Sequence, residues 1–260
     1  RRWRLDEAHH EKAGQRRLIM NTDPTRNGQI SVAGRLRRSK GRDGMVFHTI
    51  RIAPRTEKIY QRLGYRRDIT RLTPQQEQLI DRYIDEALAL IHLQGIMIRL
   101  PICGHGVGFV VLGEDLRLES TNLAAFLHGC DEVLVMGATA GESVMAAIRT
   151  DMATDHITRA VVFDATAGEM ADGALDWLMD YTRREIVREG KVLLERRYSA
   201  GYGDLALENQ QAFYAVLNML EIGVQITPQC LLIPEKSVTA ITGIRKGGRA
   251  TEPAVQENSK

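Results

Sequence analysis

The 260-residue sequence contains few cysteines and few aromatic residues. Its three cysteines, Cys103, Cys130 and Cys230, are far apart and form no Cys-x-x-Cys pair. An odd and scattered set argues against a disulfide framework or a zinc site and favours a reducing, cytoplasmic setting. The histidines also lack partners at metal-ligand spacing, so we expect them to be packing or surface residues and expect no metal site.

Aromatic residues are especially scarce in the basic first segment, residues 1–44, where Trp3 stands alone. This segment holds 12 Lys/Arg against 5 Asp/Glu, a net charge of +7, whereas the remainder holds 23 against 28, a net charge of −5. A nucleic-acid-binding arm needs several stacking residues, so we expect no nucleic-acid partner. The segment has no apolar run long enough for a signal peptide or a membrane span, and we expect no membrane partner. We interpret residues 1–44 as a basic flexible tail or a non-native leader.

Helical signals recur between this segment and a polar C-terminal tail at residues 247–260. Thr73, followed by proline and two glutamines, has the pattern of a capping box and predicts a helix over residues 74–92. Ser120 is predicted to cap a short helix. Hydrophobic periodicity predicts two longer helices, over residues 164–188 and 205–222.

Short apolar runs predict the strands. They lie at residues 104–113 (a strand and a turn), 133–136, 160–163, 230–233 and 238–244. Alternating helices and strands indicate an α/β protein. This periodicity is equally compatible with a doubly wound sheet of the Rossmann type, and the fold class does not identify the chemistry.

The strand at residues 133–136 leads through small residues, Gly137 to Gly141, into a helix predicted over residues 142–152. A strand, a tight turn and a helix N-terminus can together bind an anion. The turn lacks the Gly-x-Gly-x-x-Gly spacing and the lysine of nucleotide-binding loops, so close strand–helix packing is the default interpretation. A nucleotide-dependent α/β enzyme that uses the turn at Gly137–Gly141 stays open as an alternative function.

The loop around residue 200 is the most informative pattern in the chain. It reads Arg196-Arg197-Tyr198-Ser199-Ala200-Gly201-Tyr202-Gly203-Asp204. Glycine lets a backbone approach a ligand closely, and the planar fork of arginine suits a carboxylate or a phosphate. The pattern therefore predicts a ligand-binding loop, with an ordinary turn as the alternative.

The same residues resemble the Arg-x-(Ser/Ala)-x-Gly-Tyr pattern of the activation domain of cobalamin-dependent methionine synthase. Two further segments of the family pattern follow in order, Gly223-Val224-Gln225-Ile226-Thr227 and Pro234 with Ser237-Val238. The resemblance covers about residues 49–243, and we place the activation-like domain at residues 45–246. It implies an α/β (α+β) fold, a single C-shaped domain around a twisted, mainly antiparallel sheet flanked by helices.

The resemblance also implies a site for S-adenosylmethionine. The cofactor-binding residues carried over are Arg197, Ser199, Ala200, Gly201, Tyr202 and Asp172. Arg197 would bind the carboxylate of the methionine moiety, and Asp172 matches an acidic position, usually glutamate, near the ligand's ammonium group. The alternatives are that Arg197 pairs with a structural carboxylate, that Tyr202 belongs to the core and that Asp172 lies on a solvated helix face. No ionisable catalytic residue is expected.

In this family the domain restores methylcobalamin from cob(II)alamin, using an electron from flavodoxin or a similar low-potential donor and a methyl group from S-adenosylmethionine. The chain lacks the cobalamin-binding domain and its Asp-x-His-x-x-Gly motif. The resemblance therefore implies a stand-alone cytoplasmic activation protein that acts on a separate corrinoid methyltransferase, such as methionine synthase, which supplies the cobalamin. A non-catalytic corrinoid-protein interaction module that has lost S-adenosylmethionine binding is the second interpretation, so whether the chain is itself an enzyme stays open.

Overall fold

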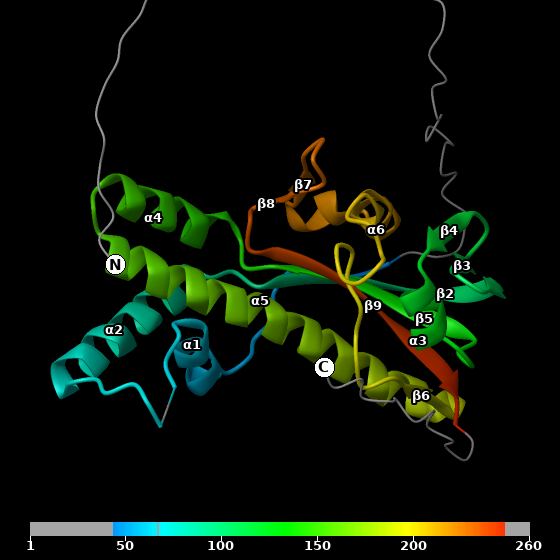
Figure 1. Cartoon of the computed structure of the whole chain (residues 1–260), viewed down its shortest axis with the longest axis horizontal. Coiled ribbons are helices and arrows are strands. Elements are labelled where there is room, and N and C mark those ends of the chain that lie inside the picture. The colour runs from blue at the N-terminus through cyan, green and yellow to red at the C-terminus, as the bar shows by residue number, and fades with distance from the viewer. Residues whose placement is uncertain (1–43, 67, 248–260) are drawn as a thin grey trace, which may run out of the picture. The chain divides into compact units, whose positions relative to one another are not determined.

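One antiparallel sheet with helices on both faces makes up most of the described part of the chain. The computed structural model describes residues 44–66 and 68–247 (Figure 1). Residues 1–43 and 248–260, which hold nearly all of the two predicted tails, lie outside the described residues. The domain boundaries at residues 45 and 246 therefore stay a prediction.

Within the described residues the main sheet has seven strands in the order β4-β3-β2-β5-β9-β6, with β1 also paired to β2. The strands are β1 (Met45–Phe47), β2 (Gln94–Gly106), β3 (Phe109–Leu112), β4 (Leu116–Glu119), β5 (Glu132–Thr139), β6 (Lys191–Leu193) and β9 (Ser237–Lys246). Every pairing in this sheet is antiparallel. The expected mainly antiparallel sheet flanked by helices is confirmed, and the doubly wound parallel sheet is excluded.

The helices cover both faces of this sheet. They are α1 (Thr56–Arg62), α2 (Pro74–Leu90), α3 (Thr121–Phe126), α4 (Glu142–Ala153), α5 (Ile157–Ile186) and α6 (Asn209–Leu217). Two short strands, β7 (Gln225–Ile226) and β8 (Leu232–Ile233), form a separate pair after α6. In the described residues none of the helices is long and apolar enough to cross a membrane.

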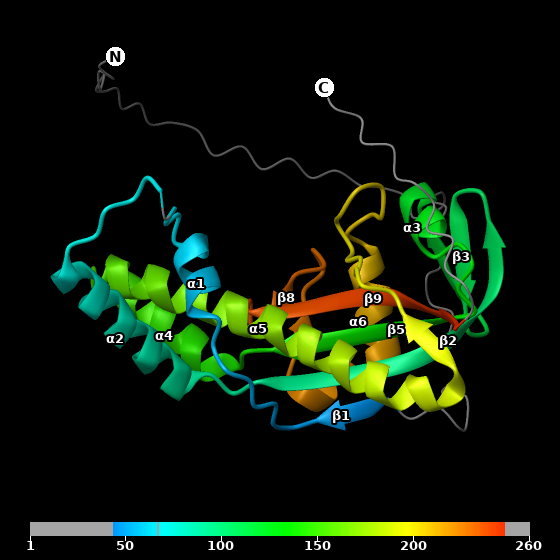
Figure 2. The same ribbon diagram turned by 90° about the horizontal axis from the view of Figure 1, so that it is seen from below.

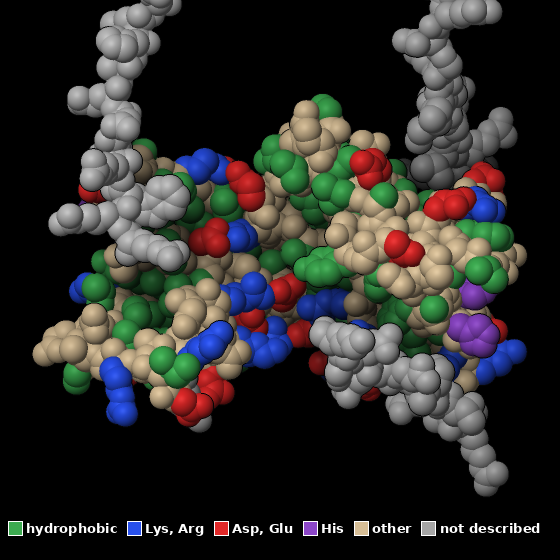
Figure 3. Space-filling model, in the orientation of Figure 1, with side chains coloured by type: hydrophobic (Ala, Val, Ile, Leu, Met, Phe, Trp, Pro, Cys, Tyr) green, Lys and Arg blue, Asp and Glu red, His purple; other side chains and the backbone are tan. Residues whose placement is uncertain are grey.

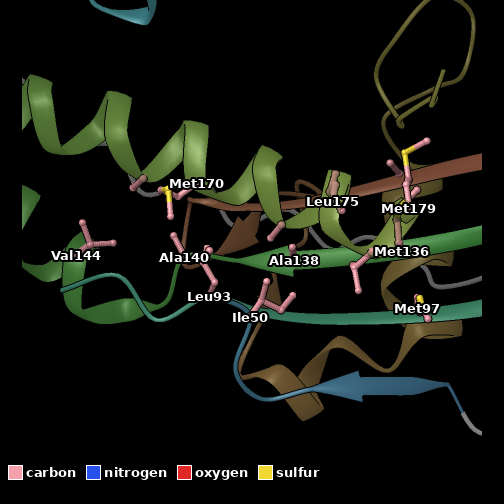
Figure 4. Close-up of a cluster of buried hydrophobic side chains, with 14 of the residues drawn as sticks. Ile50, Leu93, Met97, Met136, Ala138, Ala140, Val144, Met170, Leu175 and Met179 are labelled. Carbon is pink, nitrogen blue, oxygen red and sulfur yellow. The ribbon is translucent and has the colours of Figure 1, made fainter. Parts of the chain in front are cut away.

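Strand β5 separates two hydrophobic cores. Its Leu134, Met136 and Ala138 belong to the core under α5, whereas Val133 and Val135 belong to the core under α6. Side chains alternate between the two faces of a strand, so one apolar run serves both cores. Figure 4 shows Met136 and Ala138 in one buried cluster with Leu175 of α5. Helix α5 runs along the sheet in both views (Figures 1 and 2).

The strand predicted at residues 160–163 is wrong, because these residues belong to α5, which begins at Ile157. Ala160, Val162 and Phe163 are buried, as an apolar run suggests. Helix α5 contacts α1, α2 and α4 as well as the sheet, so its apolar surface is wider than one stripe. A short run on such a helix cannot be distinguished from a buried strand by periodicity alone.

The long helix predicted over residues 205–222 is also wrong in extent. Helix α6 ends at Leu217, because Asn218 adopts a left-handed backbone with φ of 54°. Asparagine tolerates this conformation better than most residues and commonly ends helices. A short 3-10 helix, Met219–Ile222, follows, and the buried Leu205 lies in the loop before α6.

Several local predictions are confirmed. Thr73 accepts a hydrogen bond from the Gln76 amide while the Gln76 side chain accepts one from the Thr73 amide, which completes the capping box of α2. Ser120 caps α3 through the Leu123 amide. The turn expected at Gly137–Gly141 is shorter than predicted, because β5 continues to Thr139.

Four charged side chains tie the β6 end of the sheet together. Arg99 donates to Glu189 at 2.6 Å and to Glu132 at 2.7 Å, and Lys191 donates to Glu189 at 2.7 Å. The hydrogen bonds from Arg99 and Lys191 lower the pKa of Glu189 to about 2. The ionised carboxylate is therefore favoured in the folded state.

We expect the substitution Glu189→Gln to lower the free energy of unfolding at pH 7. A carboxyl group with a lowered folded-state pKa stabilises the fold above its ordinary pKa of about 4.3 and loses that contribution as the pH falls through the folded value. The difference between wild type and variant should therefore shrink between pH 4 and pH 2. Urea unfolding at several pH values measures it, with Glu195→Gln, at a 92% exposed side chain, as the control. A difference that does not depend on pH would contradict the assigned interaction.

Candidate ligand groove

A groove with a volume of about 680 Å³ lies between α5, the loop before α6 and the first residues of β9. Its walls also include the turn between β7 and β8, through Cys230, Leu231 and Leu232. Acidic and basic side chains lie next to one another over the middle of α5 on this face (Figure 3). The groove thus has a charged wall on α5 and an apolar wall at the β7–β8 turn.

The structure brings most of the predicted binding residues together at this groove. Asp172, Arg197, Ser199, Ala200 and Tyr202 line it. Gly201 shapes the turn instead, with φ of 84° and its amide donating to the Leu205 carbonyl at 2.8 Å. The residues come from α5 and from one loop, so the groove exists only in the folded chain.

Arg197 lies at the charged wall and already has carboxylate partners. Its guanidinium donates a short hydrogen bond to Asp176 and lies 3.6 Å from Asp172. The alternative that Arg197 pairs with a carboxylate is thus observed. One of these carboxylates, Asp172, also lines the groove, so the groove holds an arginine and a carboxylate side by side.

The loop is fixed to strand β9 at the floor of the groove. Tyr198 and Ile241 exchange two backbone hydrogen bonds of 2.8 Å, and the Ser199 hydroxyl donates to the Thr239 carbonyl at 2.8 Å. The Thr239 hydroxyl in turn donates to the buried Gln210 of α6 at 3.0 Å. These hydrogen bonds therefore hold loop, strand and helix in one arrangement.

Tyr202 lies at the mouth of the groove with 69% of its surface exposed. This exposure excludes the alternative that Tyr202 belongs to the core. The glycines on either side, Gly201 and Gly203, both have positive φ, which L-amino acids with side chains rarely adopt. The two glycines let the chain reverse sharply and present the tyrosine ring to solvent.

Asp204 is a loop residue to which sequence reasoning assigned no role. It accepts hydrogen bonds from the Ser120 hydroxyl and from the amides of Thr121 and Asn122, at the N-terminus of α3. The Ser120 hydrogen bond, together with those backbone amides, lowers the pKa of the Asp204 carboxyl. The loop is thereby anchored at its far end as well. The predicted cap at Ser120 was the available signal, but its partner lies 84 residues away.

The alternative anion site at Gly137–Gly141 is closely packed. A Cβ on Gly137 would lie 2.8 Å from the Met219 side chain, and one on Gly141 would lie 3.2 Å from the His92 carbonyl oxygen. The first turn of α4 also carries the acidic Glu142, which disfavours an anion at this helix N-terminus. These contacts agree with the default interpretation of strand–helix packing.

No group of three or more His, Cys, Asp or Glu side chains suited to a metal ion occurs within residues 44–66 and 68–247. The described cysteines are free thiols, of which Cys230 is buried beside the groove. Burial is the main cause that raises the pKa of Cys130 to about 11, so that thiol stays protonated at neutral pH. The polar chemistry of the groove thus comes from hydroxyl, carboxylate and guanidinium groups.

Comparison with known proteins finds similarity to solved structures. The sequence matches no family model and no curated protein. Among solved structures, it is similar to the "Crystal Structure of the MetH Reactivation Domain bound to AdoHcy", with a TM-score of 0.57 and 12% sequence identity. The match covers 81% of this chain and 80% of that one. The resemblance to the methionine synthase activation domain is therefore confirmed in the fold.

We expect Gly203→Ala to destabilise the protein more than Gly223→Ala. Both glycines have positive φ, which costs alanine about 1–2 kcal/mol. A Cβ on Gly203 would also lie 2.2 Å from the Tyr198 hydroxyl, whereas nothing lies within 4 Å at Gly223. Overpacking should add about 1–3 kcal/mol at Gly203 alone. Urea unfolding of both variants measures the difference, and equal losses would show that the Tyr198 side chain yields to the added methyl group.

Proposed function

We propose that this protein binds S-adenosylmethionine in the groove and supports reductive methylation of a corrinoid cofactor carried by a partner protein. The observation that carries the proposal is the position of Arg197 and Asp172, side by side on one wall of a groove in a reactivation-domain fold. The MetH reactivation domain of the similar structure was crystallised with AdoHcy, the demethylated product of such a donor. The proposal transfers that ligand class to this groove.

The groove's chemistry suits a ligand with a zwitterionic end and an apolar end. Small-molecule sites are commonly about 300–1,000 Å³, and this groove has a volume of about 680 Å³. Arg197 would bind the carboxylate of the amino-acid end, and Asp172 would accept from its ammonium group. The adenosine end would lie against Leu207 and Leu231, two partly exposed leucines of the opposite wall.

Methyl transfer from a sulfonium requires placement and no general acid or base, so the chain's contribution is orientation. A reduced corrinoid held by the partner supplies the nucleophile, and a flavodoxin-like or other low-potential donor supplies the electron. Loop anchoring through Ser199 and Asp204 would keep the donor methyl group at one place along the groove. The exposed ring of Tyr202 would face the corrin carrier and help to exclude water from the closed complex.

A second candidate is an interaction module that keeps the fold and has lost the ligand. The pairing of Arg197 with Asp176 favours it, because the groove's cation is already satisfied by the chain itself. The two candidates differ in one measurable property. The first binds S-adenosylmethionine and its product, and the second binds neither.

We expect AdoMet and AdoHcy to bind the wild-type protein in calorimetric titrations and Arg197→Ala to weaken both on the order of 10- to 100-fold. This loss of affinity is typical when one hydrogen bond to a charged group is removed. Arg183→Ala serves as the control, since Arg183 is a surface arginine of α5 paired with Asp180.

Decarboxylated AdoMet tests which ligand group Arg197 recognises. Decarboxylated AdoMet should bind the wild-type protein about as weakly as AdoMet binds the Arg197→Ala variant. Because this analogue has no carboxylate, Arg197→Ala should reduce its affinity little further. Full affinity in Arg197→Ala would contradict the residue assignment. Failure of wild type to bind either AdoMet or AdoHcy at millimolar concentration would favour the interaction module.

A further inference from the structure

Six charged side chains on and around α5 alternate in sign and close into a ring. In order around the ring they are Arg197, Asp176, Arg55, Glu169, Arg62 and Asp172. Arg55 contacts Asp176 at 2.6 Å and Glu169 at 2.7 Å. Arg62 contacts Glu169 at 2.8 Å and also pairs with Asp172. Arg197 closes the ring between Asp172 and Asp176.

The sequence builds this ring from two segments that pack on α5. The carboxylates at positions 169, 172 and 176 follow helical spacing and share one face of α5. Arg55 directly precedes α1 and Arg62 is its last residue, and both views show α1 next to α5 (Figures 1 and 2). A Cβ on Gly173 of α5 would lie 2.7 Å from Ile52, so this glycine lets the segment before α1 lie directly on the helix.

Only part of the ring reaches the groove. Arg197 and Asp172 line it, whereas Arg55 contacts its ring partners outside the groove lining. Asp176 joins the two parts because both Arg55 and Arg197 donate to it. Burial alone would raise the pKa of Asp176, but the hydrogen bond and charge of Arg197, followed by those of Arg55, hold it below its ordinary value. An ionised Asp176 therefore competes with any ligand carboxylate for Arg197.

We propose that Arg55 is a positioning residue that sets how strongly Asp176 holds Arg197. Arg55 neutralises Asp176 from the side away from the groove, which weakens the pull of that carboxylate on the groove's cation. When a ligand carboxylate takes Arg197, Asp176 keeps Arg55 and no partly buried charge loses its last partner. The identity of the ligand rests on the proposed function. The ion pair between Asp176 and Arg197 does not depend on it.

A second consequence concerns the ligand's charge. When a ligand carboxylate pairs with Arg197, the other five side chains carry a net charge of −1, and Asp172 keeps Arg62 as its partner. A zwitterionic amino-acid end supplies the anion for Arg197 and a cation for these five side chains, so the site as a whole stays neutral. A ligand with a carboxylate and no ammonium group would add net negative charge beside Asp172. With the proposed ligand, this charge balance would favour α-amino-acid zwitterions over simple carboxylates.

The first experiment measures AdoHcy affinity. Arg55→Met should weaken binding about three- to tenfold, because Asp176 then relies on Arg197 alone. Asp176→Asn should bind at least as tightly as wild type, and the double variant Arg55→Met with Asp176→Asn should recover wild-type affinity. A purely structural role of Arg55 would not be repaired by removing a second member of the ring. Arg159→Met, which breaks ion pairs elsewhere on α5, is the matched control and should leave affinity unchanged.

The second experiment needs no ligand. Dicarbonyl reagents react with neutral guanidine, so a more tightly paired arginine reacts more slowly. Peptide mass spectrometry should find modification of Arg197 slower in Arg55→Met and faster in Asp176→Asn than in wild type. Arg55→Lys keeps the positive charge but has fewer hydrogen-bond donors, so its Arg197 should be modified at a rate between those of wild type and Arg55→Met. This variant replaces Arg55→Met if the methionine variant does not fold.

The outcomes separate the two proposals. If AdoHcy does not bind wild type but the Arg197 reaction rates shift as expected, the proposed ligand is wrong and the positioning role stands. The opposite outcome has three parts: AdoHcy binds wild type, Arg197→Ala abolishes that binding, and Arg55→Met changes neither the affinity nor the reaction rate of Arg197. In that case the positioning role of Arg55 is overturned and the proposed function stands.

Discussion

The burial of α5 against the sheet is the constraint from which the rest of this structure follows. Leu175 and Leu178 are fully or almost fully buried over the central strands, and each contributes on the order of 1.5–3 kcal/mol. With that face against β5 and another against α2 and α4, the helix cannot rotate. Its acidic face is consequently fixed at the groove. The position of the groove's charged wall is thus determined by hydrophobic packing of α5.

The loop opposite α5 is held by a different kind of force. Hydrogen bonds fix it at both ends, to β9 through Ser199 and to α3 through Asp204. These bonds are individually modest, but together they order the loop, and an ordered loop loses less entropy on binding than a flexible one does. The groove combines a wall fixed by hydrophobic burial with a wall fixed by polar anchors. Tyr202 remains exposed between these anchors.

Features that depend on residues close together in the sequence could be predicted, and features that depend on distant residues could not. The caps at Thr73 and Ser120 depend on neighbours three residues away, and they were predicted correctly. The loop motif identified Arg197 and its surroundings through resemblance. The partners of that loop could not be predicted, because Asp204 contacts α3 across 83 residues and Arg55 contacts α5 across 121. The strand prediction for residues 160–163 was wrong for a further reason. A helix that is enclosed by several neighbours has no clear amphipathic pattern, so its apolar runs resemble those of a buried strand.

The sheet order has a consequence for how the protein is made. Strand β9, the last strand within the described residues, lies between β5 and β6, so β5 has an unpaired edge until residues 237–246 have been synthesised. That edge belongs to one of the most apolar segments of the molecule, which is the type of surface that chaperones shield and aggregates recruit. The floor of the groove belongs to the same late strand. A nascent chain therefore completes the floor of the groove and covers this apolar strand edge in the same step, when β9 pairs with β5.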